Sequence, residues 1–144
     1  TTMIALANVA DILGLPGKLA PRSPIGLVAR IEDGLPLDAV ERVARLVAPG
    51  DSQFKYRLVP RATYERRKAR KVLSSEEGTR LARLARVWGL ALDVWGSEEE
   101  ARAFLFRPHP MIEDRRPVDV VIQSEFGAEM VVDILGGLRY GTAA

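Results

Sequence analysis

The sequence contains no cysteine and a single histidine, His109, among its 144 residues. The absence of cysteine excludes disulfides, thiolate nucleophiles and cysteine-type zinc sites, and one histidine leaves little for a histidine-based metal site. No apolar run reaches the roughly 18 to 20 residues that span a bilayer, and the N-terminal stretch lacks the cationic flank of a signal peptide. We therefore expect a cytoplasmic protein with no membrane partner, no metal and no cofactor.

The residues that are present are those of an ordinary globular protein. Apolar residues make up 47% and charged residues 28% of the chain, so it can build a proper core. The net charge of only +2 hides an uneven distribution. Between positions 55 and 71 a single acid, Glu65, stands against eight basic residues, which are Lys55, Arg57, Arg61, Arg66, Arg67, Lys68, Arg70 and Lys71.

Proline, glycine and capping serines divide the chain into helices. Proline is favoured at the first position of a helix, and a serine followed three residues later by glutamate forms a capping box, as at Ser74 and Glu77. Trp88, Trp95 and Phe104 stand at helical spacing and are expected to be core residues. No strand-period run is convincing, so we predict an all-α fold. The expected helices are 1–13, 24–34, 36–48, 52–58, 60–71, 75–95, 98–107, one beginning at residue 117, and one from residue 125 to the glycine pair 136–137.

The basic helix expected over 60–71 is typical of the last helix of a helix-turn-helix unit. Thr63, Arg66, Arg67 and Arg70 stand at i, i+3, i+4 and i+7 and share one face. Ala62, Ala69 and Leu73 are expected to pack on the other. Each neutralised phosphate releases counterions, so several arginines give salt-sensitive DNA binding. A basic stripe is also typical of a solvated helix face, and this alternative stays open. The candidate DNA contacts are Arg61, Thr63, Arg66, Arg67 and Arg70.

A family resemblance rests on consecutive motifs from about residue 61 to residue 141. These motifs are RATYERRKAR, LSSEEGTRLARLARVWGLALDVWGSEEEARAFLFRP, RRPVDVV, FGAEMVVDILG and RYG. In this order they resemble the Xre/MbcA/ParS-type antitoxins, whose partners are toxins of the RES-domain class. The resemblance implies an Xre-like helix-turn-helix region over 1–73 that supports homodimerisation and operator binding. It also implies a toxin-binding domain over 74–144 that covers the active site of a toxin acting on NAD.

Carried over position by position, the resemblance also indicates a toxin-binding set near the C-terminus. Gly136 and Gly137 are expected to weaken or end the last helix and to supply the bend of an inhibitory tail. The basic residue that the family commonly places after Leu-Gly stands here at Arg139, two positions later. Arg116 and Asp119 have an equal alternative as a local salt bridge that fixes a turn. The complete set is Arg116, Asp119, Gly136, Gly137, Arg139, Tyr140 and Gly141.

Two other functions remain as alternatives at this point. A helix-turn-helix transcriptional regulator without a toxin partner would use the basic helix as its main surface. An enzyme would have to use His109 with Glu113, Asp114 and Asp119, but a lone histidine between two prolines, without a nucleophile motif, is a poor general base. We therefore expect a non-enzymatic protein.

Overall fold

A computed structural model describes residues 9–15 and 23–140, and within them every regular element is a helix, as predicted. Residues 9–13 are helical; most of the helix predicted over 1–13, and the connector 16–22, lie outside the described residues. The later elements are α2 (Pro24–Asp33), α3 (Asp38–Val47), α4 (Lys55–Leu58), α5 (Arg61–Arg67), α6 (Ser75–Trp95), α7 (Glu98–Phe106), the 3-10 turn η1 (Pro110–Ile112), α8 (Pro117–Gln123) and α9 (Glu125–Tyr140).

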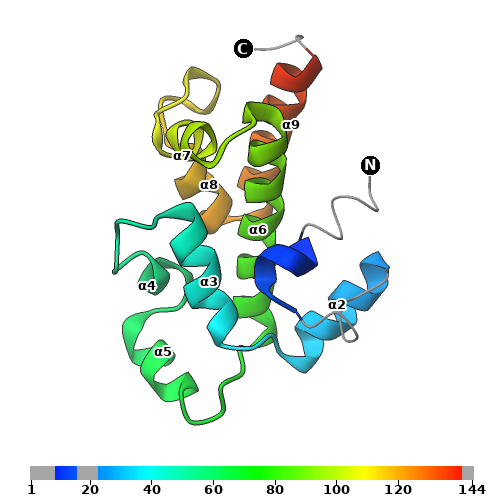
Figure 1. Cartoon of the computed structure of the whole chain (residues 1–144), viewed down its shortest axis with the longest axis vertical. Helices are drawn as coiled ribbons and strands as arrows, with labels where there is room; N and C mark the ends of the chain where they lie inside the picture. The colour runs from blue at the N-terminus through cyan, green and yellow to red at the C-terminus, as the bar shows by residue number, and fades with distance from the viewer. Residues whose placement is uncertain (1–8, 16–22, 141–144) are drawn as a thin grey trace.

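Helix α6 is the central element of the fold. It packs against α2, α3 and α4 of the preceding half of the chain and against α7, α8 and α9 of the following half. Figure 1 shows it running along the long axis of the molecule, with α9 beside it and α2 to α5 around its N-terminal end. Its most deeply buried residues are Leu84, Ala85, Val87, Trp88 and Ala91. One connected hydrophobic core therefore extends through both halves.

The ends of α6 are formed as the sequence predicts. Ser74 Oγ accepts a hydrogen bond from Glu77 N at 3.2 Å, and Glu77 Oε1 accepts one from Ser74 N at 2.8 Å, which completes the capping box. At the other end Gly96 has φ +82°, the left-handed conformation that glycine adopts without a Cβ penalty. These two local signals fix the length of the central helix.

The connection between α2 and α3 is held by a short backbone pairing. Leu73 N donates to Leu35 O at 2.8 Å, and Leu37 N donates to Lys71 O at 3.0 Å. Gly34 precedes this pairing with φ +109°, and a Cβ at its position would lie 2.2 Å from Cγ1 of Val72. The pairing joins the residues just before α3 to those just before α6, and so positions the intervening α4 and α5.

Helices α8 and α9 form a tight hairpin in the C-terminal half. Pro117 is the first residue of α8, as predicted, and Val118, Val120 and Val121 are buried, which stabilises a helix in spite of its β-branched residues. Ser124 Oγ accepts from Gly127 N at 2.9 Å and caps α9. A Cβ at Gly127 would lie 2.1 Å from the carbonyl oxygen of Val120, so this close packing requires glycine.

Candidate functional site

The basic helix differs from its prediction in length and in packing. Helix α5 ends at Arg67 rather than Lys71, and residues 68–71 form a turn in which Lys71 has φ +60°. Ala62 and Ala69, predicted to pack, are exposed; the residue that α5 buries is Tyr64. The prediction was wrong because the aromatic ring offers more apolar surface than two methyl groups, and it rotates α5 accordingly.

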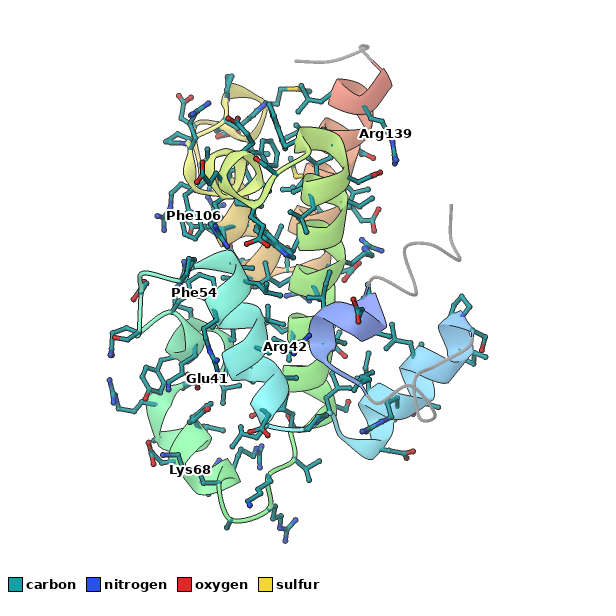
Figure 2. All side chains as sticks on the ribbon, in the orientation of Figure 1. Glu41, Arg42, Phe54, Lys68, Phe106 and Arg139 are labelled. Carbon is teal, nitrogen blue, oxygen red and sulfur yellow. The ribbon has the colours of Figure 1, made fainter. Side chains whose placement is uncertain are left out.

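Tyr64 is held in place by Glu41 of α3. The Tyr64 hydroxyl and Lys55 Nζ each donate to Glu41 Oε2 at 3.1 Å. The hydrogen bond from Lys55 lowers the pKa of Glu41 in spite of its partial burial, while burial and the hydrogen bond to Glu41 raise the pKa of Tyr64 to about 12. Glu41 therefore joins α3, α4 and α5 through one carboxylate (Figure 2). No sequence signal identified this role, because the three residues are far apart along the chain.

Of the predicted DNA contacts, Arg67 has a structural partner. Its Nε and Nη2 donate to the two carboxylate oxygens of Glu77 at 3.0 and 3.2 Å, and this ion pair raises the pKa of Arg67. Glu77 is the one charged residue that is buried in the described part of the chain. Arg67 is thus directed toward α6 rather than toward solvent.

The other predicted DNA contacts lie closer to the surface. Arg61 donates to the side chain of Gln53 and lies 4.1 Å from the ring centroid of Tyr56, and Thr63 is half-buried. Arg66 and Arg70 are exposed and form no ion pair with any described residue. Arg61, Arg66 and Arg70 are therefore the exposed cations of the predicted set, and Arg67, paired with Glu77, is the one directed toward the core.

Arg116 and Asp119, predicted as toxin contacts or as a local salt bridge, form the salt bridge. Arg116 Nε and Nη2 donate to Asp119 at 2.8 and 3.0 Å, and Arg57 of α4 lies 2.8 Å from the same carboxylate. The hydrogen bonds from Arg116 lower the pKa of Asp119 against the effect of its burial, and Arg57 lowers it further. This carboxylate therefore links the turn before α8 to the N-terminal half.

Two phenylalanine rings lie under this ion cluster. Phe54 and Phe106 meet edge to face with their centroids 6.1 Å apart, at the junction of the two halves seen in Figure 2. Arg57 lies 5.8 Å from the ring of Phe54, and Arg116 lies 5.4 Å from the ring of Phe106. Each of the two arginines thus forms both a salt bridge to Asp119 and a cation–π contact with a phenylalanine ring, and these contacts hold α4 to the turn before α8.

The C-terminal helix corrects the prediction of a bent tail. Helix α9 continues through Gly136 and Gly137 as far as Tyr140, whereas the sequence predicted that the glycine pair would weaken or end it. Each glycine costs about 1 kcal/mol in a helix interior, but the buried residues Val131, Ile134 and Leu135 hold α9 to its neighbours. Tertiary packing therefore outweighs the local propensity. Gly141, the last predicted site residue, lies outside the described residues.

Arg139 lies in the last turn of α9 and donates to the carboxylate of Asp93 in α6. Beside this turn is a cavity of about 220 Å³ that is lined by residues of α6, α7, α9 and the segment after α7. Trp95 lines it and is 37% exposed, so its predicted core position was wrong, whereas Trp88 and Phe104 are buried as predicted. The lining residues are Trp95, Glu100, Ala103, Phe104, Arg107, Pro108, His109 and Leu138.

The histidine has a structural contact of its own. His109 Nδ1 accepts a hydrogen bond from Met111 N at 3.1 Å and caps the turn η1. Among the described residues no three histidine, aspartate or glutamate side chains are grouped as metal ligands. In the same part of the chain, no helix combines the length and the apolar character needed to cross a bilayer.

Comparison with known proteins gives two matches that follow one another along the chain. Residues 26–86 match the family model of the antitoxin Xre-like helix-turn-helix domain. Residues 90–141 match the family model of the antitoxin Xre/MbcA/ParS C-terminal toxin-binding domain. No curated protein matches the sequence. Because the two matches together cover most of the chain, in the order helix-turn-helix then toxin-binding domain, the chain belongs to the Xre/MbcA/ParS-type antitoxins, the inhibitory partners of type II toxin–antitoxin systems.

Proposed function

We propose that this antitoxin acts in the cytoplasm and neutralises a RES-domain toxin by covering its NAD-binding active site. The observation that supports this most directly is the match of residues 90–141 to a toxin-binding domain. The RES class of the toxin is supported by the resemblance of the sequence motifs alone. Inhibition of this kind requires a fitting surface and no catalysis, and we propose that the chain is not an enzyme.

In this proposal the end of α9 reaches the toxin active site. Because α9 is helical to Tyr140, it presents Gly136, Arg139 and Tyr140 on a preformed element rather than on a bent tail. Gly136 has no described atom within 4 Å of the position of a Cβ, which leaves a shallow point on the helix surface where a partner can approach closely. To contact the toxin, Arg139 would have to release the carboxylate of Asp93. Arg116 and Asp119 would not contact the toxin themselves but would stabilise the turn before α8 through their salt bridge.

Co-expression with the neighbouring open reading frame tests the proposal. The neighbour alone should arrest growth and deplete cellular NAD or label a protein with ADP-ribose, and the antitoxin should restore both growth and NAD. Growth arrest with no rescue by this chain would refute neutralisation. Rescue of a toxin that leaves NAD and protein ADP-ribosylation unchanged would refute the RES assignment and leave the antitoxin role in place.

We also propose that the antitoxin is a homodimer that binds operator DNA through α5. The exposed Arg66 and Arg70 support DNA binding, and exposed Ile25 and Val28 on α2 support a contact between copies. Replacing Arg66 and Arg70 by alanine should weaken binding to the upstream promoter. It should also reduce the slope of log K against log salt concentration by about one for each phosphate that the variant no longer neutralises. Glu65→Ala is the control on the same helix, and unchanged binding by the double variant would exclude this surface.

A further inference from the structure

A groove of about 350 Å³ lies where the loop over 109–115 and the end of α8 meet the first turns of α9. Three large apolar side chains that line it are exposed: Phe126 at 78%, Met111 at 53% and Met130 at 38%. Exposed apolar side chains gathered at one place are typical of an interaction site, and methionine adapts to the shape of a partner. These residues have no role in the core or in the ion pairs of the two halves.

The loop over 109–115, which forms one wall of the groove, has its conformation fixed before any partner binds. Glu113 and Asp114 both have positive φ, +55° and +61°, a conformation that costs side-chain-bearing residues of the order of 1 kcal/mol each. His109 N donates to Arg115 O and Asp114 N donates to His109 O, each at 3.0 Å, so the two ends of the loop are joined. Ile112 anchors the loop in the core while its neighbour Met111 is exposed.

The helix wall of the groove is equally fixed. Gly127, itself a lining residue, allows α9 to lie directly against Val120 of α8, and Ser124 caps the helix immediately before Phe126. A partner that binds here would order few side chains of the antitoxin, which reduces the entropic cost of binding. Both walls are therefore preformed around an apolar surface.

The charges around the groove indicate the chemistry of the partner. Glu113 and Asp114 on the loop and Asp133, one turn beyond Met130 on α9, are exposed carboxylates, and none pairs with a cation in the described residues. Arg115 also lines the groove and donates to Gln123 at 2.6 Å; it keeps its positive charge, so the three carboxylates around the groove stand against one cation. The groove thus complements an apolar side chain flanked by basic residues, and a protein that holds an anionic dinucleotide carries such basic surface around its cleft.

We infer that this groove seats an apolar anchor side chain of the toxin, flanked by basic residues, as a second contact in addition to the end of α9; the inference rests on the proposed function. All groove residues fall within the segment that matches the toxin-binding domain. Met130 and Arg139 are nine residues apart on one helix, about 14 Å along its axis and about two and a half turns, so they lie on opposite sides of α9. The groove is therefore a contact separate from the end of α9, on another face of the same domain.

The test uses the full-length antitoxin and the purified toxin encoded beside it, with calorimetric measurement of Kd. The double variant Met111→Gln/Phe126→Ser should raise Kd about tenfold or more, because an apolar anchor at an interface is replaced. Phe126→Leu should bind almost as well as the unaltered chain, and Asp133→Lys should slow association. Val72→Thr is the matched control, since Val72 is also an exposed apolar residue, at 38%, but lies outside the segment that matches the toxin-binding domain. Thermal unfolding of each variant should stay unchanged.

Two results would overturn the groove as a toxin contact. One is an unaltered Kd for the double variant. The other is a double variant that loses self-association in sedimentation experiments while its toxin affinity is unchanged, since a second copy of the chain would then cover the groove. Failure of the unaltered antitoxin to bind the toxin would instead refute the proposed function, and the groove inference with it.

Discussion

At the scale of single residues, the structure depends on carboxylates that each serve two elements. Glu77 caps α6 and also binds Arg67 of α5, while Asp119 binds Arg116 beside it and Arg57 of α4. Partly buried charges stay charged only where hydrogen bonds and opposite charges replace water, and each of these carboxylates is provided with both. Removing one partner therefore leaves the other without compensation.

Substitution of Glu77 by alanine should lower the free energy of unfolding by about 1 to 3 kcal/mol, because it removes half of the capping box and leaves Arg67 unpaired. Chemical denaturation followed by circular dichroism measures the change. Glu76→Ala, at an exposed position in the same helical turn, should change stability by no more than about 0.5 kcal/mol. Equal effects of the two substitutions would show that the contacts of Glu77 contribute nothing.

Asp119 should make the protein sensitive to acid. Its pKa is lowered in the folded state, so its contribution to stability is fully present above the unfolded-state pKa of about 3.9 and is lost as pH falls through the folded value. Asp119→Asn should therefore be less stable than the parent at pH 7, and this difference should shrink below about pH 4. Asp33→Asn, at an exposed carboxylate without an ion pair among the described residues, is the control for the general effect of removing a charge.

At the scale of elements, glycine has opposite effects at two positions of α9. Gly127 lies against the backbone of Val120, whereas Gly136 faces open space, although both are helical and only nine residues apart. A helix-propensity argument treats the two positions alike. Their different surroundings in the folded protein decide what a side chain would do at each.

Gly127→Ala should destabilise the protein by about 1 to 3 kcal/mol, since a methyl group has no room there. Gly136→Ala should stabilise it by about 0.5 to 1 kcal/mol through its better helix propensity. Thermal unfolding of the two variants measures the contrast. Gly136→Ala also tests whether a bend is used: a stabilised variant that still neutralises the toxin would show that α9 does not have to open at the glycine pair.

At the scale of the whole molecule, arginines connect the two halves of the chain through helix ends. Arg102 of α7 donates to Leu46 O near the end of α3, and Arg80 of α6 donates to Leu58 O at the end of α4. Arg83 donates to the carbonyl oxygens of Val121 and Ile122 at the end of α8. These carbonyls have no partner within their own helices, so the arginines complement both their hydrogen-bonding capacity and the helix dipole.

This arrangement predicts that the two halves unfold together. Because α6 supplies core to both, urea denaturation should give a single transition, with the same midpoint for tryptophan fluorescence and for circular dichroism. A fragment of residues 1–73 should not fold, since it lacks the helix against which α2, α3 and α4 pack. Two separate transitions, or a folded fragment, would show that the predicted division at residues 73 and 74 is a true domain boundary.

The sequence by itself determined the helices and most of their ends. Helix ends are set by hydrogen bonds and φ preferences that act within a few residues, as at Ser74 with Glu77, Gly96, Pro117 and Ser124. Such local signals can be recognised from the sequence alone. The same holds for the family motifs, whose residue types and order along the chain are enough to indicate an antitoxin. The toxin-binding residues near the C-terminus stay a prediction from the resemblance, and the Arg116–Asp119 salt bridge was predicted as one of two alternatives.

Only the tertiary structure decided which way those helices face and what their charged groups contact. It turned α5 onto Tyr64, directed Arg67 to Glu77, extended α9 through Gly136 and Gly137, and placed Trp95 at the surface. The orientation of α5 and the length of α9 depend on partners outside the local segment, and burial against those partners contributes more free energy than the local preference that it overrides. The groove of Met111, Phe126 and Met130 has the same origin, because its two walls come from segments on either side of α8 and neither segment alone shows a pattern that predicts it.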